Sequence, residues 1–149
     1  MANALIICIG NVARGDDGVA HAVGSRLSAT TMDGVVVLSA VDLDVAMAFD
    51  VAHADLFVVV DAQRRTEPPV VIEPIPIGSS GRATGHGMDA PTLLALASSL
   101  YDRAPSRALI VSVAAPVMGH GVGLSPVAEA ACEEATSVVI DVIAAEPHA

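Results

Sequence analysis

The chain has 149 residues, of which 53% are hydrophobic, and its 7 Lys and Arg against 17 Asp and Glu give a formal net charge of −10. This length is typical of one compact domain, so the sequence predicts a single domain over residues 1–149. So acidic a chain repels phosphate backbones and anionic lipid. The sequence has three aromatic side chains of Phe or Tyr (Phe49, Phe57 and Tyr101), which are too few for base stacking. We therefore expect neither a nucleic-acid nor a membrane partner.

The first half of the chain alternates short apolar runs with segments of helical spacing. Ala4 to Ile9 is a continuous apolar run that ends at Gly10-Asn11, a pattern typical of a fully buried strand. Val19, Val23 and Leu27 recur every four residues, which indicates one face of a helix. Strands are therefore expected at 4–9, 35–38 and 56–61, and helices at 16–27 and around 43–48.

The second half continues the alternation. Proline has no N–H to donate to a sheet, so Pro74 and Pro76 predict that residues 70–77 form an edge strand, paired antiparallel. A loop is expected at 78–87, followed by a helix at 90–101 and a strand at 108–113. A Gly-rich loop at 118–124 then leads to a last helix, from Ser125-Pro126 to about 145. Together these segments predict an α/β fold, a three-layer α/β/α sandwich around a mainly parallel sheet of about five strands.

The cysteines and the N-terminal segment indicate the cellular compartment in which the protein works. Cys8 and Cys132 lie far apart without a CxxC spacing, and both fall in apolar patterns, so we interpret them as reduced and buried. The N-terminal segment lacks the pattern of a signal peptide, and no apolar stretch reaches the roughly 18 residues that span a bilayer. We therefore expect a cytoplasmic protein.

Three polar features follow predicted strands, at the edge of the sheet where open α/β folds bind ligands. They are the Gly-rich loop at 10–18, Asp61, and His86. The loop lacks the GxGxxG and GxxxxGK[ST] patterns that hold phosphates, and it places Asp16 and Asp17 at a helix N-terminus, where they repel an anion. Such a site favours a cation over a nucleotide.

Asp17, Asp61 and His86 are the candidate ligands, because two carboxylates and an imidazole suit a borderline metal ion. Spacing alone leaves ordinary alternatives open: Asp17 as a helix cap, Asp61 as a turn residue and His86 as a solvated histidine. The remaining histidines are interpreted as structural or exposed (His21, His53 and His148) or as lying in a loop near the mouth of the site (His120).

Four blocks of this sequence resemble the hydrogenase maturation proteases. They are Ile9-Gly10-Asn11 with Gly15-Asp16-Asp17-Gly18, Val59-Val60-Asp61-Ala62, Gly85-His86-Gly87-Met88 with Pro91-Thr92-Leu93-Leu94, and Gly123-Leu124-Ser125-Pro126-Val127. The blocks occur in the family's order over residues 4 to about 143. The first block is quite specific, and the combination is stronger than any one of them.

The resemblance implies a five-stranded α/β/α fold in which Asp17, Asp61 and His86 are both the catalytic and the metal-contacting residues. It implies an endopeptidase, of aspartic or metal-assisted type, that removes the C-terminal extension of a nickel–iron hydrogenase large-subunit precursor after nickel insertion. The nickel would be presented by the precursor, and the protease would work as a monomer. The alternative is a non-catalytic metal-binding or chaperone module for hydrogenase assembly on the same fold.

Two segments depart from the family's pattern. Residues 63–69, with Arg64 and Arg65, replace a Gly-containing turn, and residues 115–122 lack an acidic residue. Both could contact the substrate tail. The two arginines either pair with an acidic partner or lie solvated in the turn.

Overall fold

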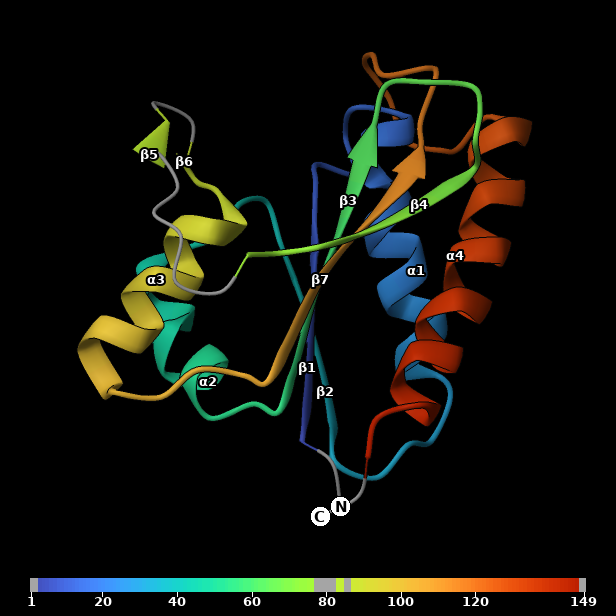
Figure 1. Ribbon diagram of the computed structural model, residues 1–149. Helices are drawn as coiled ribbons and strands as arrows, with labels where there is room; N and C mark the ends of the chain where they lie inside the picture. Colours follow the sequence, from blue (N-terminus) through green and yellow to red (C-terminus); the bar gives the residue numbers. More distant parts are fainter. Residues whose placement is uncertain (1–2, 77–82, 85–86, 148–149) are drawn as a thin grey trace.

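The computed structural model describes residues 3–76, 83–84 and 87–147, and its centre is a five-stranded sheet (Figure 1). The strand order is β2-β1-β3-β7-β4. The strands are β1 (Ala4–Ile9), β2 (Val35–Ala40), β3 (Leu56–Gln63), β4 (Val70–Pro74) and β7 (Arg107–Ala114). All neighbours pair parallel except β4, which pairs antiparallel with β7 at one edge. The prediction of a mainly parallel sheet with an antiparallel edge strand is confirmed.

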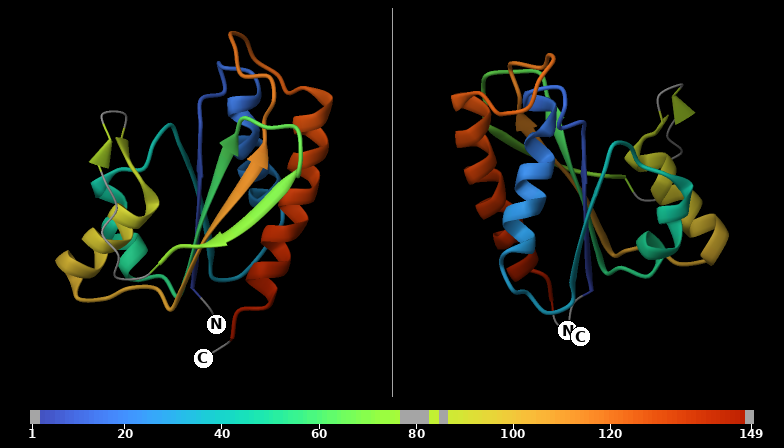
Figure 2. Two further views of the ribbon diagram at one scale, coloured as in Figure 1. Left: turned by 45° about the horizontal axis from the view of Figure 1, so that its top comes forward. Right: turned by 180° about the vertical axis from the view of Figure 1, so that it is seen from behind.

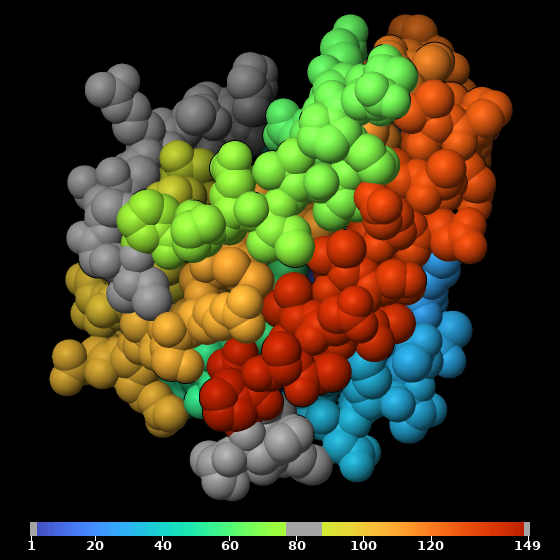
Figure 3. All heavy atoms as spheres, turned by 45° about the vertical axis from the view of Figure 1, so that its right-hand side comes forward, coloured from blue at the N-terminus to red at the C-terminus, as the bar shows by residue number. Residues whose placement is uncertain are grey.

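Helices cover both faces of the sheet, which confirms the predicted three layers (Figures 1 and 2). The helical segments are η1 (Asp16–Gly18), α1 (Val19–Ser28), η2 (Val45–Met47), α2 (Ala48–Ala52), α3 (Ala90–Tyr101) and α4 (Pro126–Ala144). Helices α1 and α4 lie on one face, and α2 and α3 lie on the other. On the surface, β4 runs beside α4 (Figure 3).

The sheet separates two apolar cores. Ile6 and Cys8 of β1 pack into the core beneath α1 and α4, and Leu5 and Ile7 pack into the core beneath α2 and α3. Successive side chains of a strand point to opposite faces, so a strand covered on both faces needs apolar residues at every position. This is why the continuous apolar run at the start of the chain predicts its strand correctly.

Some predicted boundaries change. β2 and β3 each extend two residues beyond the predicted ends, so Asp61 lies inside β3, opposite Ile9 of β1 and Ser112 of β7. The loop predicted at 78–87 is wrong at 83–84 and 87, because β5 (Ala83–Thr84) and β6 (Gly87–Met88) form a short antiparallel ladder. The rest of that loop lies outside the described residues.

The predicted start of the last helix is confirmed. The Ser125 hydroxyl accepts a hydrogen bond from the Ala128 N–H, and Pro126 occupies the first turn of α4. Cys8 and Cys132 are free and fully buried, as predicted. Of the helices that the structure describes, none has both the length and the apolar character needed to span a membrane.

Candidate functional site

The loop between β1 and α1 places Asp17 at the carboxyl edge of the sheet. Its carboxylate accepts a hydrogen bond from the Asn11 N–H at 2.9 Å, which closes the loop on itself. Gly10 has φ +150°, and a Cβ there would collide with the carbonyl oxygen of Asp17. Only glycine permits this close approach, so the backbone at position 10 fixes where Asp17 lies.

The two adjacent aspartates differ in what they contact. Asp16 is 1% exposed, and its carboxylate accepts hydrogen bonds from the N–H groups of Val117 and Ser125 at 2.8 and 2.7 Å and from the Ser125 hydroxyl at 2.7 Å. No side chain caps η1 or α1, so the alternative interpretation of Asp17 as a helix cap is wrong. Asp16 is a structural group, and Asp17 remains available to the site.

Asp61 is electrostatically coupled to Asp17. Burial, and then the negative charge of Asp17, raise the pKa of Asp61 from 3.8 to about 6, and Asp42 adds a smaller repulsion. Hydrogen bonds from the Ala62 N–H and the Gln63 side chain lower the pKa of Asp61 but do not offset the rise. The fold therefore brings together two of the three predicted site residues, which lie 44 positions apart in the chain (61 − 17). The alternative of Asp61 as a turn residue is wrong, because it lies within β3.

Removing the Asp17 charge should lower the pKa of Asp61. In Asp17→Asn we expect the Asp61 carboxyl to titrate below about pH 6 yet above its usual value, because burial remains. An NMR titration of the labelled Asp61 carboxyl carbon measures this directly. Asp33→Asn is the control, since Asp33 does not act on Asp61. An unchanged Asp61 titration in Asp17→Asn would contradict the coupling.

A pocket of about 300 Å³ opens beside Asp61. Ile9, Val59 and Ile110 give it an apolar floor, and Asp42 joins Asp61 in its lining. Sequence reasoning missed Asp42, although the signal was present. Asp42 follows β2 as Asp17 follows β1, and parallel strands end at the same edge of a sheet.

His86, the third predicted site residue, lies outside the described residues. The chain near it reaches the pocket, because Met88 lines the pocket and forms a β-bridge with Leu43. Within residues 3–76, 83–84 and 87–147, no group of three His, Cys, Asp or Glu side chains could hold a metal ion. The predicted metal-contacting trio therefore stays a prediction.

Other residues singled out from the sequence have local partners. Arg65 donates to the Pro68 carbonyl at 2.7 Å and to both the hydroxyl and the carbonyl of Ser112 at 3.0 Å, so its guanidinium is held within the chain. His21 bonds the Ala40 carbonyl at 2.9 Å, which agrees with a structural role. Arg64 and His120 are exposed, and His148 lies outside the described residues.

His53 belongs to a small aromatic cluster on the α2–α3 layer. Its Nδ1 bonds the Phe49 carbonyl at 2.8 Å, and its ring stacks on the Phe49 ring with centroids 4.2 Å apart. Tyr101 packs edge-on against Phe49 with centroids 5.4 Å apart. The interpretation of His53 as structural agrees with these contacts.

Comparison with known proteins identifies the fold. No protein-family model matches the chain, and no curated protein matches it at a significant level. Among solved structures, the hydrogenase maturating endopeptidase HybD from E. coli superposes with a TM-score of 0.74 at 20% identity, covering 95% of this chain and 91% of that one. The chain has the fold of the hydrogenase maturation proteases.

Two archaeal structures agree with the E. coli one. The [NiFe] hydrogenase maturation protease HycI from Thermococcus kodakarensis KOD1 gives a TM-score of 0.74 at 20% identity, covering 95% of this chain and 92% of that one. The [NiFe] hydrogenase maturation protease HybD from Thermococcus kodakarensis gives a TM-score of 0.68 at 22% identity, covering 94% of this chain and 98% of that one. The fold that the resemblance implies is confirmed over nearly the whole chain.

Proposed function

We propose that this chain is an endopeptidase that removes the C-terminal extension of a nickel–iron hydrogenase large-subunit precursor. The observation that supports it best is the coupled pair Asp17 and Asp61 beside a pocket, at the edge of the sheet where this fold class binds ligands. The solved proteins that share the fold are named as endopeptidases or proteases of hydrogenase maturation.

Asp17 and Asp61 suit contact with a cation brought by the substrate. Two like charges that raise a pKa repel one another, and a metal ion between them removes that repulsion. With the imidazole of His86 they would supply two oxygens and one nitrogen, which nickel accepts. The nickel belongs to the precursor, so the contact checks that the metal has been inserted before the tail is removed.

Asp61 is also the best candidate general base. Before the nickel-bearing precursor docks, its pKa of about 6 leaves it mostly ionised at neutral pH, yet more basic than an ordinary aspartate. It would take a proton from a water molecule as the water oxygen attacks the scissile carbonyl carbon. That proton then passes to the leaving amine as the C–N bond breaks, so Asp61 is regenerated.

A cysteine nucleophile does not fit the described residues. Burial raises the pKa of Cys8 to about 12, and burial also raises the pKa of Cys132. Both thiols stay protonated and out of contact with solvent at neutral pH. Water is therefore the nucleophile in this proposal.

The test is incubation of candidate large-subunit precursors with the protein, with and without nickel loading, followed by mass measurement. We expect loss of a C-terminal peptide from the nickel-loaded precursor alone. Asp17→Ala and His86→Ala should each slow cleavage by at least about 100-fold, because a group at the reacting centre contributes roughly this much or more. Normal cleavage by these variants would contradict their assigned roles. Complex formation without cleavage of any precursor would favour the chaperone alternative.

A further inference from the structure

One edge of the sheet, β2, has a row of unpaired backbone groups. The Gly34 and Ala40 carbonyls accept hydrogen bonds from β1 and the residue after it, so the even-numbered positions of β2 face β1. The N–H and C=O groups of Val35, Val37 and Ser39 therefore face outward. Within the described residues, no strand pairs with β2 on that side, and Figure 2 (right) shows β2 between the two helical layers.

The two edges of the sheet differ in their protection. The opposite edge strand, β4, contains Pro74 and Glu73, and Pro69 precedes it. Prolines, charges and bulges are the usual means by which proteins prevent further strands from pairing with an edge. β2 contains no proline and no charged residue, and its unbroken register with β1 shows no bulge. It is open to strand addition.

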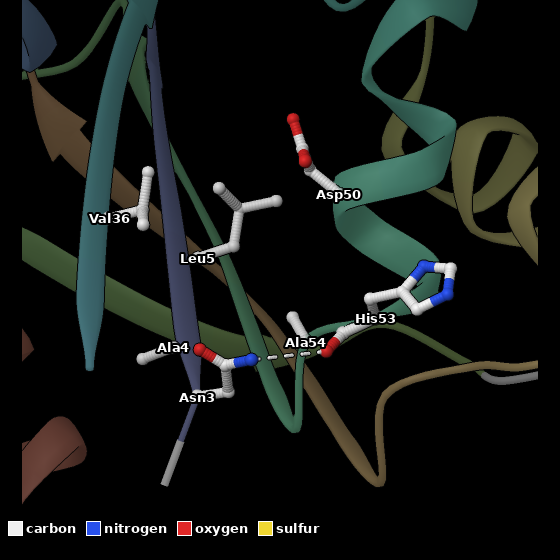
Figure 4. Close-up of a pocket in the computed structure, with 7 residues that line it drawn as sticks. All are labelled: Asn3, Ala4, Leu5, Val36, Asp50, His53 and Ala54. Atoms are coloured by element: carbon white, nitrogen blue, oxygen red, sulfur yellow. Dashed lines mark hydrogen bonds between the residues drawn. The ribbon is translucent and has the colours of Figure 1, made fainter.

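Pockets flank β2 on both faces of the sheet. On the α2 side, Val36 and Leu5 point from the sheet into a pocket of about 180 Å³, and Asp50 reaches toward it from α2 (Figure 4). On the α1 side, Val35 and Val37 line a pocket of about 350 Å³. Side chains of an added strand alternate between the faces, so they would enter the two pockets in turn.

The charged residues near β2 indicate which kind of segment could pair with this edge. Asp33 precedes β2, Asp42 and Asp44 follow it, and Asp50 lines the pocket on its α2 side. Between Arg26 and Arg64 the sequence has no Lys or Arg. This surface attracts a basic segment and repels a second copy of a chain whose net charge is −10. The pocket on the α2 side is the smaller of the two, and Leu5, Val36 and Ala54 give it an apolar lining, so a small apolar side chain suits it.

We propose that β2 binds an extended peptide segment, with Lys or Arg among small apolar residues, as a sixth strand of the sheet. The proposal rests on the proposed function, since the segment is taken to be part of the protein substrate. β2 ends at Ala40, and Asp42 lines the pocket beside Asp61, so a segment paired with β2 runs to the proposed cleavage site.

The first test compares proline substitutions on the two edges. Val37→Pro removes an outward N–H from β2, and Ile72→Pro removes an outward N–H from β4, the opposite edge of the sheet. We expect Val37→Pro to raise the KM for precursor by about tenfold over Val37→Ala, with little change in kcat, because backbone bonding to the segment is lost. Ile72→Pro should leave KM unchanged. Equal KM values for the two proline variants would overturn the proposal.

A charge swap at Val36 tests the same surface without disturbing the backbone, since this side chain is 51% exposed. Val36→Lys should raise KM and Val36→Glu should lower it, each by about twofold to fivefold at low salt. Equal effects from both variants would count against a basic segment.

Binding without cleavage separates this proposal from the proposed function. The probe is a capped six-residue peptide that alternates Val and Arg, titrated to about 1 mM against labelled protein, with a Val–Glu peptide as the matched control. We expect amide shifts at Val35, Val37 and Ser39 with the first peptide only. Such shifts support the surface even if no precursor is cleaved, in which case the proposed function fails alone. No shifts, together with normal processing by Val37→Pro, would overturn the surface and leave the proposed function standing.

Discussion

Replacing Asp61 by Asn is expected to abolish precursor processing and, at the same time, to stabilise the protein at neutral pH. Asn cannot accept a proton from water, so we expect processing to fall by about 1,000-fold. The gain in stability comes from removing a carboxylate that is partly buried and repelled by Asp17. A residue that costs stability and is required for function is typical of an active site.

The pH dependence follows from the same shift. The folded protein keeps the Asp61 proton up to about pH 6, whereas the unfolded chain loses it near the usual pKa of 3.8. Between these values the unfolded state binds fewer protons, so the wild-type protein loses stability as the pH rises through this interval, by about 1–3 kcal/mol in total. In Asp61→Asn this loss disappears.

Thermal unfolding of both proteins at about pH 4 and about pH 7.5 measures the difference. Asp141→Asn, an exposed change on α4, is the matched control and should follow the wild type. If Asp61→Asn is less stable than the wild type at neutral pH, the proposed repulsion is wrong. Cleavage at the wild-type rate would remove Asp61 from the reaction.

Replacing Asp16 by Ala is expected to destabilise the protein by about 2–5 kcal/mol, because buried donors to a carboxylate lose their partner. Asp16 is almost fully buried and accepts three hydrogen bonds, two of them from Ser125 and one from the Val117 N–H. These bonds join the loop that holds Asp17 to the start of α4. We therefore expect Asp16→Ala also to slow processing, although Asp16 itself contacts no substrate in the proposal.

Denaturant unfolding checks the size of the effect. Asp16→Asn keeps one acceptor oxygen and should lose less stability than Asp16→Ala. Ser125→Ala should cost about 1–2 kcal/mol, since it removes a helix cap and one bond to Asp16. The double variant should lose less than the sum of the two single losses, because the residues share a bond. A loss below about 1 kcal/mol in Asp16→Ala would contradict this role.

The sequence predicts the layers well because their signals are local. Apolar runs identify strands that are covered on both faces, and Pro74 correctly indicates an edge. The β5–β6 ladder was missed because strands of two residues show no periodicity. The ends of β2 and β3 were placed too early, since polar residues such as Ser39 and Gln63 continue the ladders.

The site was harder to predict because it depends on contacts between distant parts of the chain. Asp16 and Asp17 are equivalent in the sequence, and only partners 101 and 109 residues away make the first one structural. Asp42 lies two residues after the observed end of β2, Ala40, but four residues after the end that the sequence predicts, Leu38, so the sequence does not indicate it as a strand-end residue. The grouping of Asp17 with Asp61 follows from their places after predicted strands and is strengthened by the family resemblance, and the sheet edge brings the two charges together.

The aromatic cluster on the α2–α3 layer determines which part of the protein intrinsic fluorescence monitors during unfolding. The chain has no tryptophan and a single tyrosine, Tyr101, which packs against Phe49 and His53. Tyrosine emission therefore reports on α2 and α3, whereas far-ultraviolet circular dichroism reports on all helices and strands. If the two signals change at the same denaturant concentration, the layers on either side of the sheet unfold as one cooperative unit.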